Sequence, residues 1–405
     1  MTTPISSPAG ATRATGFSVQ NNPMKIECYF RTKRRDPLLR KIAGICRELG
    51  YGIDMEETML HIYPCPLAEL AIGWRRKNIL LSSQWELAGG CDTSQAGPGL
   101  HKAVAELLDR IGQENVTNLT VDDSTGYWEH RDFRRLKDEA FRLWLEKQRR
   151  QKQEFLCWDL DVYQPEHIPD TIVTSLGRFT RKELEQVDAD RFFLWPGPGK
   201  DALYYRNRAL YDLWTSCHYT PDDPVNESIL DNLEKAHWAD PELPLPLSAY
   251  RELCIVSGHE FQISEDAPEL EERYSPGYRK GMVRNRIGSL RFLLPGSYRF
   301  EVERLENGSL GSLWQDESIE SPQWRVSGFL RESGQNAEYA ADFSAMQEVE
   351  QISLQNGEAR MGWTGDQITC EAVIGPGLYV LNVTYHTPEE REESRALLRQ
   401  IESCL

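Results

Sequence analysis

The pattern of apolar residues changes twice along this chain, and these changes constrain its fold more than any single motif does. Strand-like and helix-like stretches alternate up to about residue 155, a proline-rich region follows, and short strands dominate from about residue 280. The chain has 405 residues, more than the roughly 250 to 300 over which a single core keeps growing. We therefore predict a multi-domain α+β protein with small mixed or antiparallel sheets and packed helices. The expected parts are a disordered tail (1–22), an N-terminal α+β domain (23–155), a mostly helical, loop-rich middle region (156–279) and a C-terminal α+β domain (280–405).

The N-terminal domain is expected to begin with a strand after Met24, followed by a helix over Pro37–Leu49 whose apolar residues form one stripe. Short strands follow, and the basic segment Arg75–Lys77 is interpreted as the turn between two of them. The other expected strands are Met59–Tyr63, Leu70–Trp74, Asn78–Ser83 and Leu119–Val121, and the other expected helices are Leu100–Ile111 and Arg131–Phe155.

The middle region shows a clear pair of helical patterns, Tyr204–Thr215 and Val225–Ala239, and a shorter one over Ser248–Cys254. The prolines from Pro241 to Pro246 end the second helix, because proline has no amide hydrogen and disfavours helix in the residue before it. The acidic segment 264–273 is expected to be a loop or solvated linker.

The last part of the chain combines short strands with a terminal helix. Thr387 as N-cap, Pro388 at the first helical position and Glu390 at the third form a capping-box pattern. The expected strands are Leu290–Leu294, Tyr298–Val302, Gln323–Leu330, Ile352–Leu354, Ile368–Val373 and Leu378–Tyr385. A single α+β domain is the resulting prediction.

This succession of strands, ending in Gly377–Tyr385 and followed by the helix opened by Thr387-Pro388-Glu389-Glu390, resembles the PsbP-like α/β domains. The resemblance covers roughly the last 115 residues and rests on pattern without a diagnostic motif. It implies a C-terminal PsbP-like sheet with a helix, and a role in binding or assembly. No functional residue follows from it.

The charge of the chain bears on its partners. A formal net charge of -17 repels phosphate backbones unless a basic face is segregated, and this disfavours nucleic acid as a partner. An acidic surface suits a basic protein partner, because complementary fields speed encounter. The oligomeric state is left open by the sequence.

The compartment is inferred from what the sequence lacks. The segment 1–22 has no apolar core of the kind that a secretory signal needs, and no stretch approaches the ~20 apolar residues that cross a bilayer. The nine cysteines include no CxxC pair, and reduced thiols are the simplest interpretation. We therefore expect a cytoplasmic protein without membrane contact, most in keeping with a bacterial origin.

Two motif-like segments fail on spacing. His130-Arg131-Asp132 resembles a kinase catalytic loop, but Lys137 stands where the metal-binding Asn belongs. Gly197–Lys200 ends like a P-loop, but Asp201 replaces the Ser or Thr. The eight histidines include no HExxH and no pair at four-residue spacing. Neither a metal nor another cofactor is predicted.

The candidate site is the densest polar and aromatic cluster, residues 122–132. One interpretation makes it a loop facing a cleft, in which His130 acts as acid or base. The other, which we favour, is that Glu129 and Asp132 stabilise the start of the following helix. The candidate binding residues in this cluster are Asp122, Asp123, Tyr127, Trp128 and His130.

The basic helix after this cluster adds Arg149 and Arg150 to the candidate binding residues. They could contact nucleic acid or an acidic partner, although an ordinary solvated helix face is the favoured interpretation.

Three functions are compatible with these observations. The leading hypothesis is a non-enzymatic protein-binding module, and a bacterial immunity or defence-associated protein fits this description. The first alternative is a hydrolase whose site assembles only in three dimensions, using carboxylates with His130 or His218. The second alternative is an assembly factor of a larger complex, which the C-terminal resemblance suggests.

Overall fold

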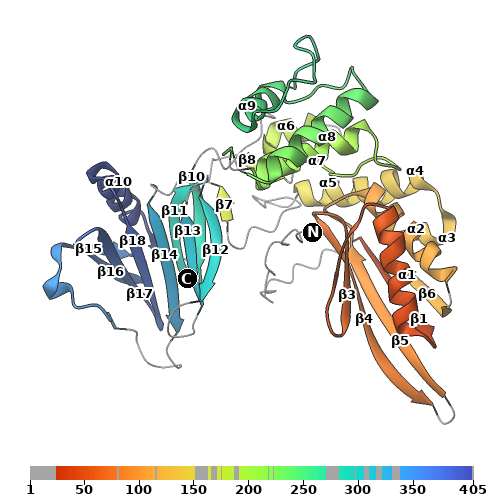
Figure 1. Ribbon diagram of the computed structural model, residues 1–405, viewed down its shortest axis with the longest axis horizontal. Helices are drawn as coiled ribbons and strands as arrows, with labels where there is room; N and C mark the ends of the chain where they lie inside the picture. Colours follow the sequence, from red (N-terminus) through yellow and green to blue (C-terminus); the bar gives the residue numbers. More distant parts are fainter. Residues whose placement is uncertain are drawn as a thin grey trace.

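The computed structural model describes residues 24–79, 82–114, 116–150, 163–165, 171–174, 176–186, 191–217, 219–221, 223–270, 282–296, 298–304, 310–315, 322–330 and 338–403. Several antiparallel sheets with packed helices make up this part of the chain (Figure 1). The predicted multi-domain α+β class is confirmed. The predicted tail lies outside the described residues, and the predicted domain boundaries remain predictions.

The N-terminal part is a six-stranded antiparallel sheet with two helices on one face (Figure 1). Alternate residues of strand β1, among them Ile26, Cys28 and Phe30, are buried beneath these helices, as expected for a sheet with one covered face. The strands are β1 (Lys25–Thr32), β2 (Gly52–Met55), β3 (Met59–Cys65), β4 (Ala68–Ile79), β5 (Ser82–Asp92) and β6 (Thr117–Asp123), in the order β2-β3-β4-β5-β1-β6; the helices are α1 (Arg35–Glu48) and α2 (Pro98–Gly112).

The prediction of a turn at Arg75–Lys77 was wrong. These residues lie inside β4 and pair with Gln84 to Glu86 of β5, and the hairpin closes where Ile79 faces Ser82. Two long strands therefore replace the expected pair, and one of them, β5, continues to Asp92. Consecutive cations are typical of turns. Here they lie in the part of the β4–β5 hairpin after Gly73, where β4 no longer pairs with β3.

The helix predicted over roughly Arg131–Phe155 is present as far as Arg150, where the described part ends, but it begins at Phe133 and a separate short helix precedes it. A short helix, α3 (Tyr127–His130), ends at Arg131, which has a left-handed φ of 54°. A new helix then starts because the Asp132 side chain accepts a hydrogen bond from the Arg135 amide at 3.1 Å, so the expected role of Asp132 at a helix start is confirmed. It runs through α4 (Phe133–Arg135), a π-helical segment (Leu136–Phe141) and α5 (Arg142–Arg150). Residues 151–155 lie outside the described part.

Trp195 joins the first sheet to the chain that follows. Its amide donates to the Ala96 carbonyl at 2.8 Å, and its carbonyl accepts from the Gly99 amide at 2.9 Å. The apolar core of the six-stranded sheet continues through this contact to Tyr204. The sheet core thus includes side chains on both sides of residue 155, among them those near the hairpin β8 (Thr171–Thr174) and β9 (Gly177–Thr180) and helix α6 (Arg181–Gln186).

Three helices with a core of their own follow, and we call them the helical unit. They are α7 (Ala202–Thr215), α8 (Val225–Ala239) and α9 (Leu247–Ser257). The helical patterns found in the sequence predicted all three, and the bounds of α8 agree with the prediction. Asp201 caps α7 by accepting from the Tyr204 amide at 3.0 Å.

The C-terminal part contains a seven-stranded and a four-stranded antiparallel sheet with one helix. The capping box at Thr387 and Glu390 is confirmed at the start of α10 (Pro388–Leu398). Phe292, Trp314 and Trp324 lie at the centre of its core. The seven-stranded sheet has the order β12 (Arg299–Arg304), β13 (Leu310–Gln315), β14 (Gln323–Leu330), β18 (Gly377–Thr384), β17 (Gln367–Ile374), β16 (Gly357–Thr364) and β15 (Gln347–Leu354). The four-stranded sheet has the order β19 (Glu402–Ser403), β11 (Leu290–Pro295), β10 (Met282–Ile287) and β7 (Tyr163–Pro165).

The Trp195 contact gives a first testable prediction. A Cβ atom on Gly99 would overlap the Trp195 ring and the Gly197 carbonyl, whereas one on Gly44 in α1 would meet open space. We expect Gly99→Ala to lower the free energy of unfolding by about 3 kcal/mol through overpacking. Gly44→Ala should raise it by up to about 1 kcal/mol, because alanine favours helix. Urea unfolding followed by tryptophan fluorescence measures both, and equal effects would contradict this packing.

Candidate functional site

A buried pair of opposite charges joins the sheet to helix α2. His101 lies on α2, and its Nε2 is 3.0 Å from Oδ1 of Asp123, the last residue of β6. Neither side chain has any exposed surface. Nδ1 of His101 lies 2.8 Å from the hydroxyl of Thr93, directly after β5. The pair therefore connects three elements at one end of the sheet.

The directions of the hydrogen bonds define the charge of this pair. The Thr93 hydroxyl donates to the Met24 carbonyl at 2.9 Å, so it accepts a hydrogen from Nδ1 of His101. The Asp123 carboxylate only accepts, so Nε2 donates as well. An imidazole that donates from both nitrogens is an imidazolium. On this basis we assign the contact as a buried ion pair, in agreement with the direction in which the charge of His101 shifts the pKa of Asp123.

The Asp123 carboxylate has a full set of donors. Burial raises its pKa, but the charge and hydrogen bond of His101 and the hydrogen bonds of Thr125 lower it, and the resulting pKa lies well below the usual range. Its Oδ1 accepts from the Thr125 amide and hydroxyl, both at 2.8 Å, and its Oδ2 from the Trp128 amide at 2.7 Å. The carboxylate thereby shapes the segment that leads into α3.

This arrangement does not reproduce a hydrolytic triad. A triad needs the nucleophile on the ring nitrogen opposite the carboxylate. The Thr125 hydroxyl, at 3.2 Å, lies on the same nitrogen as Asp123, and the Thr93 hydroxyl, which lies on the opposite one, belongs to a completely buried residue that no substrate can reach. The buried imidazolium also has no surface through which a substrate could reach it. We interpret the pair as a structural element.

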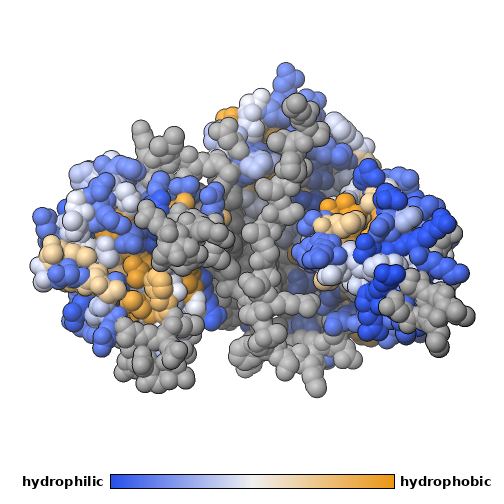
Figure 2. All heavy atoms as spheres, turned by 60° about the horizontal axis from the view of Figure 1, so that its bottom comes forward, coloured by the Kyte–Doolittle hydropathy of each residue, from blue (hydrophilic) through white to orange (hydrophobic). Residues whose placement is uncertain are grey.

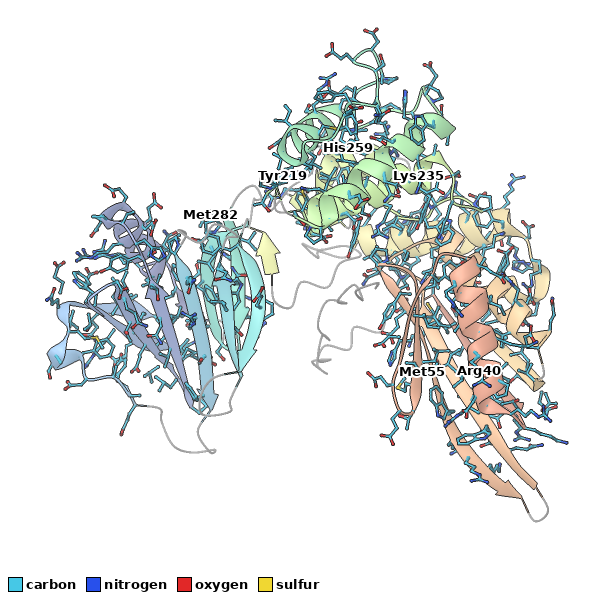
Figure 3. All side chains as sticks on the ribbon, in the orientation of Figure 1. Arg40, Met55, Tyr219, Lys235, His259 and Met282 are labelled. Atoms are coloured by element: carbon cyan, nitrogen blue, oxygen red, sulfur yellow. The ribbon has the colours of Figure 1, made fainter. Side chains whose placement is uncertain are left out.

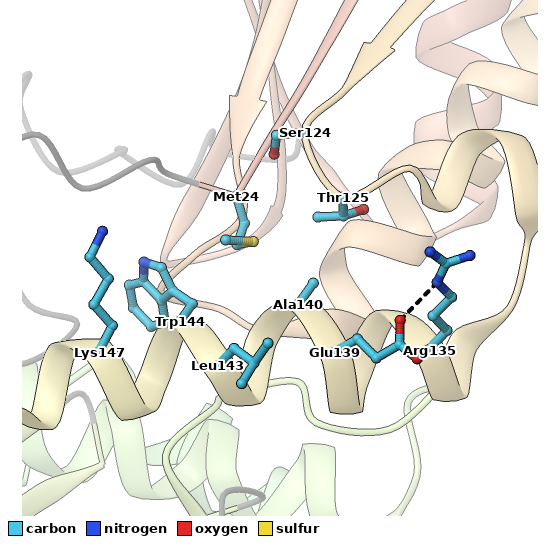
Figure 4. Close-up of a pocket in the computed structure, with 9 residues that line it drawn as sticks. All are labelled: Met24, Ser124, Thr125, Arg135, Glu139, Ala140, Leu143, Trp144 and Lys147. Carbon is cyan, nitrogen blue, oxygen red and sulfur yellow. Dashed lines mark hydrogen bonds and ion pairs between the residues drawn. The ribbon is translucent and has the colours of Figure 1, made fainter.

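A hollow of about 410 Å³ lies beside this pair, between the start of β1 and α5 (Figure 4). The Ser124 hydroxyl donates to the Lys25 carbonyl at 3.1 Å, and the Thr125 hydroxyl bonds Asp123. No histidine or cysteine is among the described residues that line it. The lining residues are Met24, Ser124, Thr125, Arg135, Glu139, Ala140, Leu143, Trp144 and Lys147.

The other candidate residues of the 122–132 cluster have separate environments. Asp122 is exposed and pairs in register with Glu27 of β1. Tyr127 is buried with its ring edge-on to His101, at 6.2 Å between centroids. The Trp128 ring is covered by the Arg131 guanidinium, 4.1 Å from its centroid. Of the five candidate binding residues in the cluster, Asp123 is the one that bonds directly to the buried histidine.

His130 and His218 were the histidines of the predicted hydrolase alternative. Nδ1 of His130 accepts a hydrogen bond from the Asp132 amide at 3.0 Å. Its Nε2 is buried and has no hydrogen-bond partner within the described chain. His218 lies outside the described residues.

Arg149 and Arg150 lie away from this cluster, on α5. The Arg149 guanidinium lies over the Phe192 ring, 4.5 Å from its centroid, and burial lowers the pKa of Arg149. Both arginines line a second hollow of about 400 Å³ together with Arg181 and Leu184. The predicted binding residues therefore lie in two separate places. Those of the 122–132 cluster lie from the end of β6 to α3, and Arg149 and Arg150 lie at the end of α5.

Sequence reasoning missed a cluster of charges on the helix-free face of the sheet. Glu86 of β5 accepts from the Tyr29 hydroxyl at 2.8 Å, and from Lys77 and Arg75 at 3.0 Å each. Arg31 lies 3.1 Å from the same carboxylate. The Tyr29 hydroxyl first, and then Lys77 and Arg75, lower the pKa of Glu86 to about 2. The signal in the sequence was the run Arg75–Lys77, which was interpreted as a turn.

Sequence reasoning also missed an apolar surface on the helical unit. Trp238, Ile255 and Phe261 keep 63%, 73% and 57% of their surface exposed. Trp238 lies one helical turn after Glu234, whose Oε1 accepts from the Tyr250 hydroxyl at 3.0 Å and contacts Nε2 of His259 at 2.8 Å.

The same contacts bring Phe261 to α8. The Tyr250 hydroxyl accepts from the Gln262 amide at 2.8 Å, and the Phe261 ring lies 6.5 Å from the Tyr250 ring. Figure 3 shows His259 beside α8, the helix that also carries Lys235. Glu234, Tyr250 and His259 thus form a small hydrogen-bonded group, which we call the node. Trp238 follows Glu234 on α8, Phe261 lies beside Tyr250, and Ile255 is exposed on the adjoining α9.

The described part of the chain contains no candidate site for metal binding or for thiol chemistry. No group of three or more His, Cys, Asp or Glu side chains there is arranged to hold a metal ion. The described cysteines are buried and lie in no disulfide, and burial raises the pKa of the Cys28 thiol to about 12. Among the described helices, none has the length and apolar character required to span a bilayer.

No known protein family, no curated protein and no solved structure matches this chain significantly. The resemblance of the C-terminal part to PsbP-like domains remains a prediction.

The ion pair gives a second testable prediction. Asp123→Asn leaves a buried imidazolium without its counter-charge, and we expect a loss of about 3 kcal/mol in the free energy of unfolding at pH 7. Asp122→Asn, at the exposed neighbour, should change it by less than about 0.5 kcal/mol. Urea unfolding of the two variants measures the difference.

The pH dependence of the same variant tests the charge. The pKa of Asp123 is lowered on folding, so its contribution to stability is present above the unfolded value of about 3.9 and is lost as the pH falls below it. The difference between wild type and Asp123→Asn should therefore shrink as the pH falls from about 5 to 3. A difference that stays constant over this range would contradict the ion pair.

Proposed function

We propose that this chain is a protein-binding module and that the helical unit presents one of its binding surfaces. The observation that carries the proposal is the exposure of three large apolar side chains, Trp238, Ile255 and Phe261. Other apolar side chains of the same unit, such as Leu233 and Leu253, are completely buried. Exposed tryptophan and phenylalanine side chains are typical of binding surfaces, where they fill pockets of a partner.

The charge around these side chains indicates the kind of partner. Residues 226–269 contain ten Asp and Glu but only two Lys and Arg. A partner with an apolar pocket and a basic rim complements this surface, because opposite charges speed encounter and reject wrong partners. This agrees with the basic protein partner expected from the net charge.

The node beneath the surface favours binding without large rearrangement. Glu234 is mostly buried and is held by Tyr250 and His259, which come from α9 and from the segment after it. A fixed node positions the side chains beside it before the partner arrives, and this reduces the entropy lost on binding.

A biological setting follows from the same reasoning. A bacterial immunity or defence-associated role in the cytoplasm fits a module that acts by binding another protein. The predicted PsbP-like character of the C-terminal part, which implies binding or assembly, is consistent with this role.

The third testable prediction concerns this surface. We expect affinity purification of the tagged chain from its native cell, with nuclease treatment, to yield a stoichiometric protein partner. Titration calorimetry with that partner should then show about 30-fold weaker binding for Trp238→Ser/Phe261→Ser, since loss of an aromatic anchor costs about 2 kcal/mol. Leu143→Ser, which removes a side chain with 56% exposure from α5, is the matched control.

Two results would contradict the proposal. One is a partner that binds the double variant as tightly as it binds the wild type and the control. The other is a chain that yields no stoichiometric partner under these conditions.

A further inference from the structure

A basic end on an acidic molecule is the feature that the proposed function does not use. Residues Arg31, Lys33, Arg34 and Arg35 follow one another along the end of β1 and the start of α1, and Arg75, Arg76 and Lys77 lie on β4. We call these seven residues the basic end. Among the described residues of these segments, Asp36 and the facing Glu86 supply the acidic side chains.

The two parts of the basic end are held together by direct contacts. Arg31 and Arg75 both contact the Glu86 carboxylate, at 3.1 and 3.0 Å. The Arg35 guanidinium lies over the Trp85 ring at 4.3 Å and near the Trp74 ring at 5.5 Å from the centroid. Strands β1 and β4 and helix α1 thus present their cations at one end of the sheet, around Trp85 and Glu86 of β5.

These cations reach the solvent. The side chains of Arg75 and Lys77 are 80% and 51% exposed, whereas that of Glu86 is 4% exposed. Lys33 and Arg34 are exposed as well. Figure 2, in which this lobe lies at the right, shows mainly hydrophilic side chains on the part that comes forward. One buried carboxylate leaves most of the positive charge directed outward.

We propose that the basic end binds an acidic segment of a partner protein. Several cations within a Debye length of about 8 to 10 Å add their potentials, so they attract a cluster of carboxylates more strongly than a single one. Each exposed ion pair contributes little by itself. The occupant is therefore a segment with several acidic side chains in succession.

Two observations favour a protein over nucleic acid as the occupant. Nucleic acid continues beyond a short patch with a charge at every nucleotide, and the chain as a whole, with a net charge of -17, repels it. Single-stranded nucleic acid also binds through bases that stack on aromatic rings. The Trp85 ring at this end is covered by Arg35, and the Tyr29 hydroxyl bonds Glu86 and Arg31.

The fourth testable prediction uses the full chain and a labelled decapeptide of glutamates as the probe. Fluorescence anisotropy at low salt should show binding that weakens steeply as salt is added. Arg75→Glu/Lys77→Glu should weaken it at least tenfold. Arg134→Glu/Arg142→Glu, which changes the net charge equally at exposed positions on α4 and α5, should weaken it less than threefold.

Two further variants keep the test independent of folding defects. Lys33→Glu/Arg34→Glu alters only exposed side chains and should also weaken binding at least tenfold. Glu86→Gln removes the buried carboxylate that occupies the cations, and it should strengthen binding about threefold. Circular dichroism confirms that each variant is folded before its affinity is compared.

The outcomes that overturn the proposal are distinct. Tighter binding of a thymidine decanucleotide than of the peptide would make nucleic acid the occupant. Self-association at low salt that Lys33→Glu/Arg34→Glu abolishes would make a second copy the occupant. If all the double variants weaken binding equally, or if the peptide does not bind, the basic end is not a binding site for acidic segments. None of these results bears on the helical-unit surface, which Trp238→Ser/Phe261→Ser tests separately.

Discussion

The buried ion pair between His101 and Asp123 is the constraint on which the N-terminal half depends. Two charges removed from water are stable only when the surrounding groups satisfy them, and here the Thr93 hydroxyl and the Trp128 amide do so. These groups come from the end of β5 and from the start of α3, while the pair itself comes from α2 and β6. Satisfying the pair therefore fixes how these elements meet, and it explains why Asp123 and Tyr127 of the densest polar segment are turned inward.

This arrangement separates the charges that hold the fold from those that face outward. Inside, His101 and Asp123 neutralise each other without contact with solvent. Outside, the basic end lies at the hairpin end of the six-stranded sheet, and the acidic excess of residues 226–269 belongs to the helical unit. Trp195 connects the sheet to the chain that leads into that unit, through hydrogen bonds to Ala96 and Gly99. Two surfaces of opposite charge thus belong to separate packing units of one chain.

The sequence predicted the elements whose signals are local. Helix α8 has an apolar stripe and flanking prolines, and α10 has the capping box at Thr387. The prediction failed where distant residues decide the structure. Glu86 stabilises the basic stretch of β4 from the neighbouring strand, so a segment that resembles a turn is a strand. The partner of Asp123 is His101 on another element, and no local spacing identifies such a pair.

The net charge illustrates the same difference between local and distant information. A total of -17 suggests basic partners for the whole molecule, but fields between exposed charges are screened beyond about 8 to 10 Å. A partner that approaches the basic end meets Arg75 and Lys77, and one that approaches the helical unit meets Trp238 and its acidic neighbours. Since the fold, and not the composition, gathers these groups, the charges within one Debye length decide which partner each proposed surface would attract.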